Sequence, residues 1–286
     1  MEDPTTLMDA STLQLIILPA GLIAVLFAIY LARDVLSRDT GTVEMQAVAG
    51  TIFEGAVAFI RRQYSTIGIL ALVGSVVLFV IIYLVETAEV ADVPKLAGFP
   101  IAIMTAFSFL VGAACSMASG IIGMYISVKA NVRTASAARR SLVEAVQVAM
   151  RGGAVSGFLV VALSLLGVWG IFTLYDTLVA DVTVADAPFL IVGFGFGASF
   201  VALFAQLGGG IYTKAADVGS DLVGKVEKGI PEDDPRNAGV VADLVGDNVG
   251  DCAGRGADLF ESTAAENIGA MILGVAAFAI ADRAGW

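Results

Sequence analysis

The 286-residue sequence has no histidine, only two cysteines and few charged side chains. Without histidine, any general base must be a carboxylate, a lysine or a metal-bound water. Cys115 and Cys252 are too few to build the disulfide framework of a secreted domain, and we expect both to be small buried residues. Charged residues make up 15% of the chain, whereas soluble domains average about 25%. This scarcity of charge places the chain among membrane proteins before any motif is considered.

Positive charge is scarcer than negative charge, and the acidic side chains are unevenly spread. The formal net charge is −11, and eleven of the 27 acidic residues lie between Asp217 and Glu261. A local acidic excess attracts cations and repels nucleic acid. We therefore expect cationic ligands and no nucleic-acid partner.

Apolar residues, by contrast, make up 58% of the chain, and the mean hydropathy is +0.87. Six apolar segments reach the roughly 18 residues that mark a membrane-spanning helix. Helices of soluble proteins average only about 11–12 residues, so burial in a large soluble core is the weaker interpretation. The sequence predicts an all-α fold, a polytopic transmembrane helix bundle with about six spans in one domain covering residues 1–286. The segments are 13–32, 65–85, 99–128, 153–175, 188–213 and 259–281.

The basic residues predict the topology of these spans. Fourteen of the sixteen Lys and Arg residues lie in alternate connections, namely between spans one and two, three and four, and five and six. Connections rich in Lys and Arg face the cytoplasm. We therefore expect a multi-pass protein of the cell membrane with its N-terminus outside and its long charged connections in the cytoplasm.

The acidic cluster falls in residues 206–262, where two helical stripes are predicted. At 100° per residue, spacings of three, four and seven keep side chains on one face of a helix. The first stripe consists of Lys214, Asp217, Asp221 and Lys225. The second consists of Asp243, Asp247, Asp251 and Asp258. Glycine and proline at 229–231 and proline at 235 break the helix between them, which predicts a helical hairpin with carboxylates on both arms.

Carboxylates in such a row repel one another unless cations lie among them. Two carboxylates about 4 Å apart repel by roughly 1 kcal/mol in water and about 4 kcal/mol at an effective dielectric constant of 20. Mg²⁺ is typically held by a few carboxylates together with substrate phosphate oxygens, and the two lysines supply positive charge for a phosphate. A solvated acidic loop is the weaker interpretation, because the acids recur on one face and alternate with Gly246, Gly250 and Gly254. An EF-hand is excluded, because its loop needs acids at alternate positions.

At these residues the sequence resembles the membrane-bound inorganic pyrophosphatases, the H⁺- or Na⁺-translocating family. The resemblance extends over nearly the whole chain from about residue 54, and runs this long and polar are highly specific. The matching runs are EGAVAFIRRQY, GMYISVKANVRTASAA, FGFGAS, GGGIYTKAADVGSDLVGKVE, GIPEDDPRN, VGDNVGDCAG and GADLFES. The resemblance implies a larger bundle of about sixteen spans working as a homodimer, of which this chain is the N-terminal part.

The resemblance also implies a role for each acidic or basic residue of the cluster. Lys214 and Lys225 would contact pyrophosphate. Asp247 and Asp251 would be catalytic, with Asp251 one of two aspartates that deprotonate the attacking water. Several Mg²⁺ ions would be bound by Asp217, Asp221, Asp247, Asp251 and, as a further candidate, Glu232. The residues linking the site to the ion channel would be Asp243, Asp258, Glu261 and Gln206.

Two positions depart from the family pattern, and part of the site is expected elsewhere. Gln206 stands where the family commonly has an arginine, and Leu244 stands where an asparagine is usual. The second water-orienting aspartate and further lysines are expected from C-terminal helices that this chain lacks. K⁺ is a possible additional cofactor. The transported ion is expected to be H⁺ rather than Na⁺.

Two other functions stay open at this point. One is a non-hydrolytic protein, either a Mg²⁺ or cation transporter or an inactive relative that binds pyrophosphate. The other is a soluble-type phosphatase merely anchored in the lipid bilayer, which acids inside the spans argue against. Hydrolysis of pyrophosphate to phosphate coupled to cation translocation is the function that we expect.

Overall fold

A computed structural model of the chain describes residues 10–87, 98–178, 186–231, 234 and 236–284. The described residues form helices and no strand, which confirms the predicted all-α fold. Six helical stretches are long and apolar enough to cross a membrane, as the sequence predicts. Cys115 and Cys252 are both free, and each is partly exposed rather than fully buried. The elements are α1 (Ala10–Leu36), α2 (Val43–Thr87), α3 (Gly98–Ala138), α4 (Leu142–Leu178), α5 (Ala187–Asp221), η1 (Leu222–Lys228), α6 (Ala238–Asp247), η2 (Asn248–Gly254) and α7 (Arg255–Ala284).

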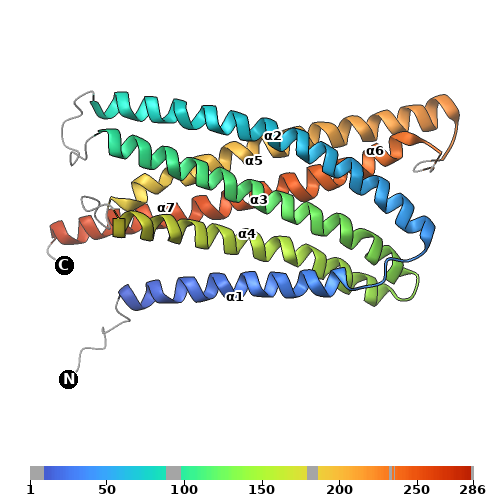
Figure 1. Cartoon of the computed structure of the whole chain (residues 1–286), viewed down its shortest axis with the longest axis horizontal. Helices are drawn as coiled ribbons and strands as arrows, with labels where there is room; N and C mark the ends of the chain where they lie inside the picture. Colours follow the sequence, from blue (N-terminus) through green and yellow to red (C-terminus); the bar gives the residue numbers. More distant parts are fainter. Residues whose placement is uncertain (1–9, 88–97, 179–185, 232–233, 235, 285–286) are drawn as a thin grey trace, which may run out of the picture.

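The long helices run side by side and alternate in direction (Figure 1). The connections at 37–42, 139–141 and 229–237 therefore lie at one end of the bundle, which we call the charged end. The start of α1 and the end of α7 lie at the other end. The structure thus brings together the three connections that the Lys and Arg pattern assigns to one side of the membrane.

Most of these helices are longer than a membrane is thick. The apolar stretch of α2, Val43–Val85, has 43 residues and is roughly 65 Å long at 1.5 Å per residue. The hydrocarbon core of a bilayer is only about 30 Å thick. The strongly apolar part, 65–85, lies in the half of α2 away from the charged end. The other half of α2, which is less apolar, extends to the charged end.

The centre of the bundle is the crossing of α3 and α5, where glycines allow direct backbone contact. A Cβ atom on Gly112 would lie 2.0 Å from the carbonyl oxygen of Phe194, and one on Gly193 would lie 2.2 Å from that of Thr105. Small residues at membrane-helix interfaces allow this close approach. A buried polar contact adds to the core where the hydroxyl groups of Ser108 and Tyr175 lie 2.8 Å apart.

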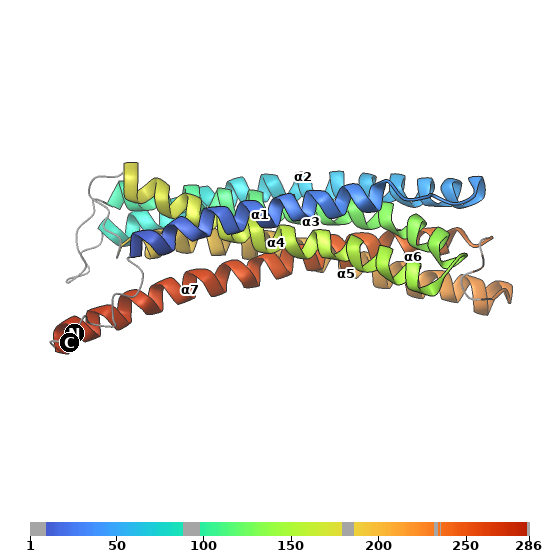
Figure 2. The ribbon, with the colours of Figure 1, turned by 90° about the horizontal axis from the view of Figure 1, so that it is seen from below.

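Helix α7 leaves this packed core toward its C-terminal end. Figure 2 shows its last turns diverging from the other helices. Large apolar side chains are exposed there, with Leu273 71% exposed and Phe278 74% exposed. In a soluble protein such exposure would be unfavourable, whereas lipid or further helices can cover it. This agrees with a partial membrane bundle.

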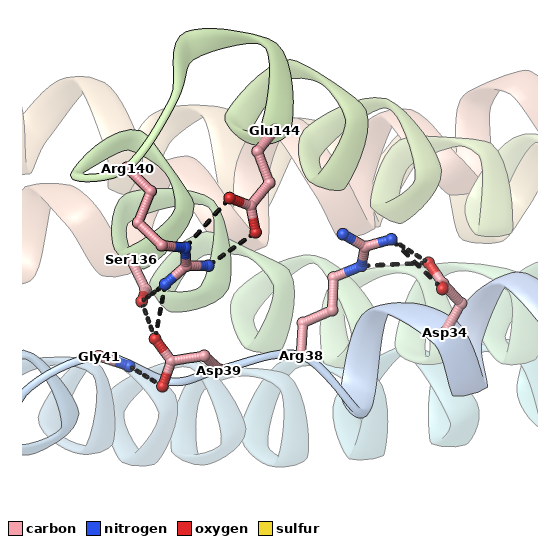
Figure 3. A network of polar contacts seen from close by, with 7 residues as sticks. All are labelled: Asp34, Arg38, Asp39, Gly41, Ser136, Arg140 and Glu144. Carbon is pink, nitrogen blue, oxygen red and sulfur yellow. Dashed lines mark hydrogen bonds and ion pairs between the residues drawn. The ribbon is translucent and has the colours of Figure 1, made fainter.

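A polar network ties together the α1–α2 and α3–α4 connections at the charged end (Figure 3). The guanidinium of Arg140 lies 2.9 Å from Asp39 and 2.7 Å from Glu144. The Ser136 hydroxyl and the Gly41 amide also donate hydrogen bonds to the Asp39 carboxylate. The Ser136 hydroxyl, the Gly41 amide and Arg140 together hold the pKa of Asp39 below its usual value.

We expect the substitution Asp39→Ala to loosen the 37–42 connection. Backbone amide hydrogen exchange in this segment should become faster, because the Gly41 amide loses its acceptor. Since the folded pKa is lowered, the wild-type contacts are present above about pH 4, the ordinary aspartate pKa, and are lost as the pH falls through the lower folded value. Glu54→Ala, which removes an exposed acid of α2, is the control. Equal exchange in both variants would contradict the network's role.

Candidate functional site

The acidic segment forms the predicted helical hairpin, but its arms are not regular α-helices. The first arm continues from α5 into the π-helical η1, and the second passes from α6 through the π-helical η2 into α7. Single π-helical turns inside α-helices often occur at functional sites. They change the rotation per residue, so the assumption of 100° per residue fails within Leu222–Lys228 and Asn248–Gly254. The predicted stripes therefore identify residues that are neighbours on each arm. The residues of one stripe do not all lie on a single straight face of the helix.

Specific residues stop the first arm and start the second. Gly229 ends η1 with φ of 63°, in the left-handed region that glycine adopts readily. Asn237 caps α6, because its side-chain oxygen accepts a hydrogen bond from the Gly239 amide. Its side-chain nitrogen donates to the carbonyl of Ser220 on α5, which fastens the two arms together. In the turn, hydrogen bonds from Arg236 lower the pKa of Asp234 to about 2.

Glycine brings the two arms into backbone contact just below the charged side chains. A Cβ atom on Gly209 of α5 would lie 2.8 Å from the Cα of Gly250 in η2. A Cβ atom on Gly246 would lie 2.7 Å from the Cα of Thr213. Gly246 and Gly250, which alternate with the acids in the sequence, are therefore sites of close backbone approach. The contact fixes how far apart the carboxylates of the two arms can lie.

Each arm carries ion pairs of its own near this contact. On the first arm, Lys214 lies 3.4 Å from the Asp217 carboxylate, and Lys225 lies 3.3 Å from that of Asp221. On the second arm, Arg255 lies 3.1 Å from the Asp251 carboxylate.

Asp247 links the two arms electrostatically. The charges of Asp251, Lys214 and Asp217 all act on its carboxylate. Charged residues of the first arm therefore lie close enough to act on Asp247 of the second arm.

Within the described part of the chain, no three carboxylates lie close enough together to form a metal centre by themselves. The candidate ligands Asp217, Asp221, Asp247 and Asp251 are divided between the two arms, so their role as Mg²⁺ ligands stays a prediction. The donor set consists of carboxylate oxygens, which is the type that Mg²⁺ prefers. Glu232 lies outside the described residues.

The acids farther along the second arm lie beside the apolar part of the bundle. The Ser199 hydroxyl of α5 donates a 2.6 Å hydrogen bond to the Glu261 carboxylate of α7. Gln206 packs against Gly254, where a Cβ atom would lie 3.0 Å from its Cα. Asp258, one turn before Glu261, is partly buried. An ionisable group at membrane depth is a candidate for ion transfer.

Asp243 lies between the hairpin turn and Asp247. It belongs to α6 and is partly buried, and its side chain is not without an interaction partner. Its assignment as a link between the substrate site and the channel stays a prediction.

Sequence reasoning missed two residues that position the site. The Asn131 side chain of α3 donates a 3.0 Å hydrogen bond to the side chain of Asn248, the first residue of η2. Gln63 of α2 donates to the carbonyls of Phe204 and Ala205, just before the Gly208–Gly210 run of α5. Neither contact has a spacing signature, because each joins helices far apart in the sequence.

Comparison with known proteins shows the family of the chain. The family described as inorganic H⁺ pyrophosphatase matches residues 22–283. A K(+)-insensitive pyrophosphate-energized proton pump of Caldanaerobacter subterraneus is 58% identical over 259 residues, which cover 90% of this chain and 36% of the relative. K(+)-insensitive pyrophosphate-energized proton pump 2 of Moorella thermoacetica is 59% identical over 261 residues, covering 91% of this chain and 35% of the relative.

A plant relative extends the likeness beyond bacteria. Pyrophosphate-energized membrane proton pump 3 of Arabidopsis thaliana is 52% identical over 258 residues, covering 88% of this chain and 32% of the relative. The chain spans about a third of the length of the curated relatives it matches. Since the family match covers most of the chain and includes both arms of the hairpin, the chain belongs to the inorganic H⁺ pyrophosphatase family.

Proposed function

We propose that this chain forms part of a membrane pump that hydrolyses pyrophosphate to phosphate and uses the free energy to move H⁺ across the cell membrane. The observation that carries the proposal is the backbone contact between the two helical arms at Gly209–Gly250 and Thr213–Gly246, which brings together the stretches that carry Lys214, Asp217, Asp247 and Asp251. The names of the relatives support pyrophosphate as substrate and H⁺ as the transported ion. C-terminal helices that this chain lacks would complete the pump, and a homodimer is the proposed assembly.

The two arms divide the work of binding pyrophosphate with Mg²⁺. Lys214 and Lys225 are exposed at the end of the first arm, where their ammonium groups can contact phosphate oxygens. Asp217 and Asp221 beside them, with Asp247 and Asp251 opposite, provide oxygen ligands for several Mg²⁺ ions. Bound Mg²⁺ supplies neutralisation of the substrate charge and activation of a water molecule. When Asp217 and Asp221 bind Mg²⁺, their ion pairs with Lys214 and Lys225 would break. The two ammonium groups would then be available to the substrate.

Asp251 is the proposed base that receives a proton from the attacking water. Its side chain is 59% exposed and lies 3.1 Å from Arg255. With no histidine in the chain, a carboxylate is the natural choice for this role. Asp243, Asp258, Glu261 and Gln206 would then connect the site to the ion pathway.

Lys214→Gln tests the substrate contact directly. We expect a several-fold higher KM for Mg-pyrophosphate, because one charge-assisted hydrogen bond to phosphate is lost. Lys228→Gln, which neutralises a lysine at the end of η1, is the matched control. An unchanged KM in Lys214→Gln would contradict the assignment.

The proposed function is tested by Mg²⁺-dependent phosphate release from pyrophosphate. The sample is a set of membrane vesicles containing the full-length protein. Release in the presence of Mg²⁺ that disappears with EDTA supports the proposal. A full-length protein that inserts into the membrane but releases no phosphate would instead favour the non-hydrolytic cation transporter.

Two further expectations concern the effect of K⁺ on the rate and the orientation of the chain in the membrane. Because two of the relatives are named K(+)-insensitive, we expect equal rates of phosphate release in K⁺ and in choline buffers. Because Lys and Arg gather at the charged end, the proposed orientation has the N-terminus outside and the substrate site in the cytoplasm. A cysteine introduced at Thr40 should then be labelled only from the cytoplasmic side.

A further inference from the structure

A second cluster of positive charge lies on the opposite side of α3 from the acidic hairpin. A cavity of about 200 Å³ opens between α2, α3 and the α1–α2 connection. Its basic residues are Lys129 and Arg133, one turn apart on α3. The other lining residues include Thr40, Gln46 and Phe53. The hydrolytic mechanism uses none of these residues.

Lys129 is held at this cavity by aromatic rings rather than by an acid. Its Nζ atom lies 4.2 Å from the ring centre of Phe53 and 5.5 Å from that of Tyr125. Cation–π contacts orient an ammonium group without neutralising its charge. Among the described residues, Lys129 forms no ion pair and donates no side-chain hydrogen bond. Its three N–H donors are therefore available to an anion.

Arg133 adds a second charge, and no acid of the described residues forms an ion pair with it. Its two terminal nitrogens donate to the backbone carbonyls of Lys129 and Leu36, at 2.7 Å and 2.8 Å. Its Nε is buried and has no acceptor. Carbonyl oxygens fix the guanidinium in place but carry no net charge. A partly buried cation is costly unless it is paired with an anion.

Two acids near the α1–α2 connection are already engaged in ion pairs elsewhere. Asp34 pairs with Arg38 at 3.1 Å and with Arg151 at 2.7 Å. Asp39 pairs with Arg140, as Figure 3 shows. Rearrangement of these acids toward Lys129 would break their present ion pairs. An external anion is the remaining way to neutralise the cavity.

We infer that this cavity binds a phosphate group through Lys129 and Arg133, as a site separate from the acidic hairpin. Guanidinium and ammonium groups are the usual partners of phosphate oxygens, and Thr40 and Gln46 offer further hydrogen-bond donors at the rim. A site of this kind can report the phosphate level to the hairpin through Asn131. That residue lies on the same stretch of α3 and bonds to Asn248 beside Asp247.

The depth of the cavity favours a soluble phosphate over a lipid headgroup. Counting about 20 residues of α3 from Phe99 spans the hydrocarbon core. Lys129 lies ten residues farther, or about 15 Å beyond the core at 1.5 Å per residue. The headgroup layer adds only about 5–8 Å on each side. Inorganic phosphate, the size of which suits the cavity, is therefore the probe of choice.

The test is calorimetric titration of the purified full-length protein with sodium phosphate in EDTA at constant ionic strength. Without metal, the carboxylates of the acidic hairpin disfavour phosphate there, and the comparison of variants assigns the remaining binding to the basic cavity. We expect saturable binding that Lys129→Gln weakens at least tenfold and that Lys129→Arg retains. Arg61→Gln, which removes an exposed arginine lining a different cavity of α2, should bind as the wild type does.

The outcomes show first whether the site binds phosphate and then whether the phosphate group comes from solution or from a lipid. No saturable binding, or equal binding by the wild type and Lys129→Gln, would overturn the inference. A repeat in nanodiscs distinguishes the two sources of the phosphate group. Equal binding in phosphatidylcholine and phosphatidylglycerol discs supports soluble phosphate. Binding that is lost only in phosphatidylglycerol discs supports the same site with lipid phosphate as occupant. Hydrolysis of pyrophosphate is not measured, so the test is independent of the proposed pump function.

Discussion

The substitution Asp251→Asn in the full-length protein should nearly abolish phosphate release from pyrophosphate. Asparagine keeps the size and shape of the side chain but cannot accept the proton of the attacking water. Loss of a general base lowers rates by on the order of 10²–10⁴-fold. The measurement is the initial rate of phosphate release at saturating Mg²⁺ and pyrophosphate.

Asp176→Asn is the matched control for this prediction. It makes the same chemical change at an exposed position near the end of α4, far from the charged end of the bundle. Its rate should equal that of the wild type. A thermal unfolding midpoint of Asp251→Asn within a few degrees of the wild type would show that the loss is chemical. Normal phosphate release by Asp251→Asn would remove this residue from the catalytic site.

The second large effect is expected at the crossing of α3 and α5. A Cβ atom on Gly197 would lie 1.8 Å from the carbonyl oxygen of Phe109 and 2.9 Å from the amide nitrogen of Ala113. Backbone cannot move aside as a flexible side chain can, so Gly197→Ala must push the two helices apart. Overpacking a core costs about 1–3 kcal/mol and occasionally more. We expect a clearly lower thermal unfolding midpoint, or loss of the folded protein in detergent.

Gly195→Ala provides the control on the same helix. Its Cβ atom would meet only the tip of Ile268, at 3.4 Å, which is an ordinary contact. Because alanine favours helix over glycine by up to about 1 kcal/mol, this variant should be as stable as the wild type or slightly more so. Equal destabilisation by both substitutions would show that backbone contact at Gly197 is not what limits the packing.

The long-range architecture could be predicted because it depends on simple patterns. Six apolar segments set the number of spans, and the Lys and Arg bias predicted which connections share one end. The hairpin was predicted because Gly229, Pro231 and Pro235 interrupt two stretches of regular acid spacing. Each of these signals is local in the sequence and rests on a strong physical preference.

The details of the site could not be predicted, because they depend on contacts between distant residues. The π-helical turns of η1 and η2 shift side chains away from the positions that a regular helix gives. The bond between Ser199 and Glu261 joins two spans, and nothing in the spacing of either residue indicates it. The same holds for Asn131 and Asn248. The sequence therefore predicts which residues belong to the site more reliably than how they face one another.

The proposed pump function depends on coupling between pyrophosphate hydrolysis and ion movement. The most direct test is acidification of the interior of sealed inside-out vesicles, followed with a pH-sensitive fluorescent dye after addition of Mg-pyrophosphate to the full-length protein. We expect acidification that a protonophore collapses and that Asp251→Asn prevents. Phosphate release without any accumulation of H⁺ in the vesicles would contradict it and would favour a phosphatase merely anchored in the membrane.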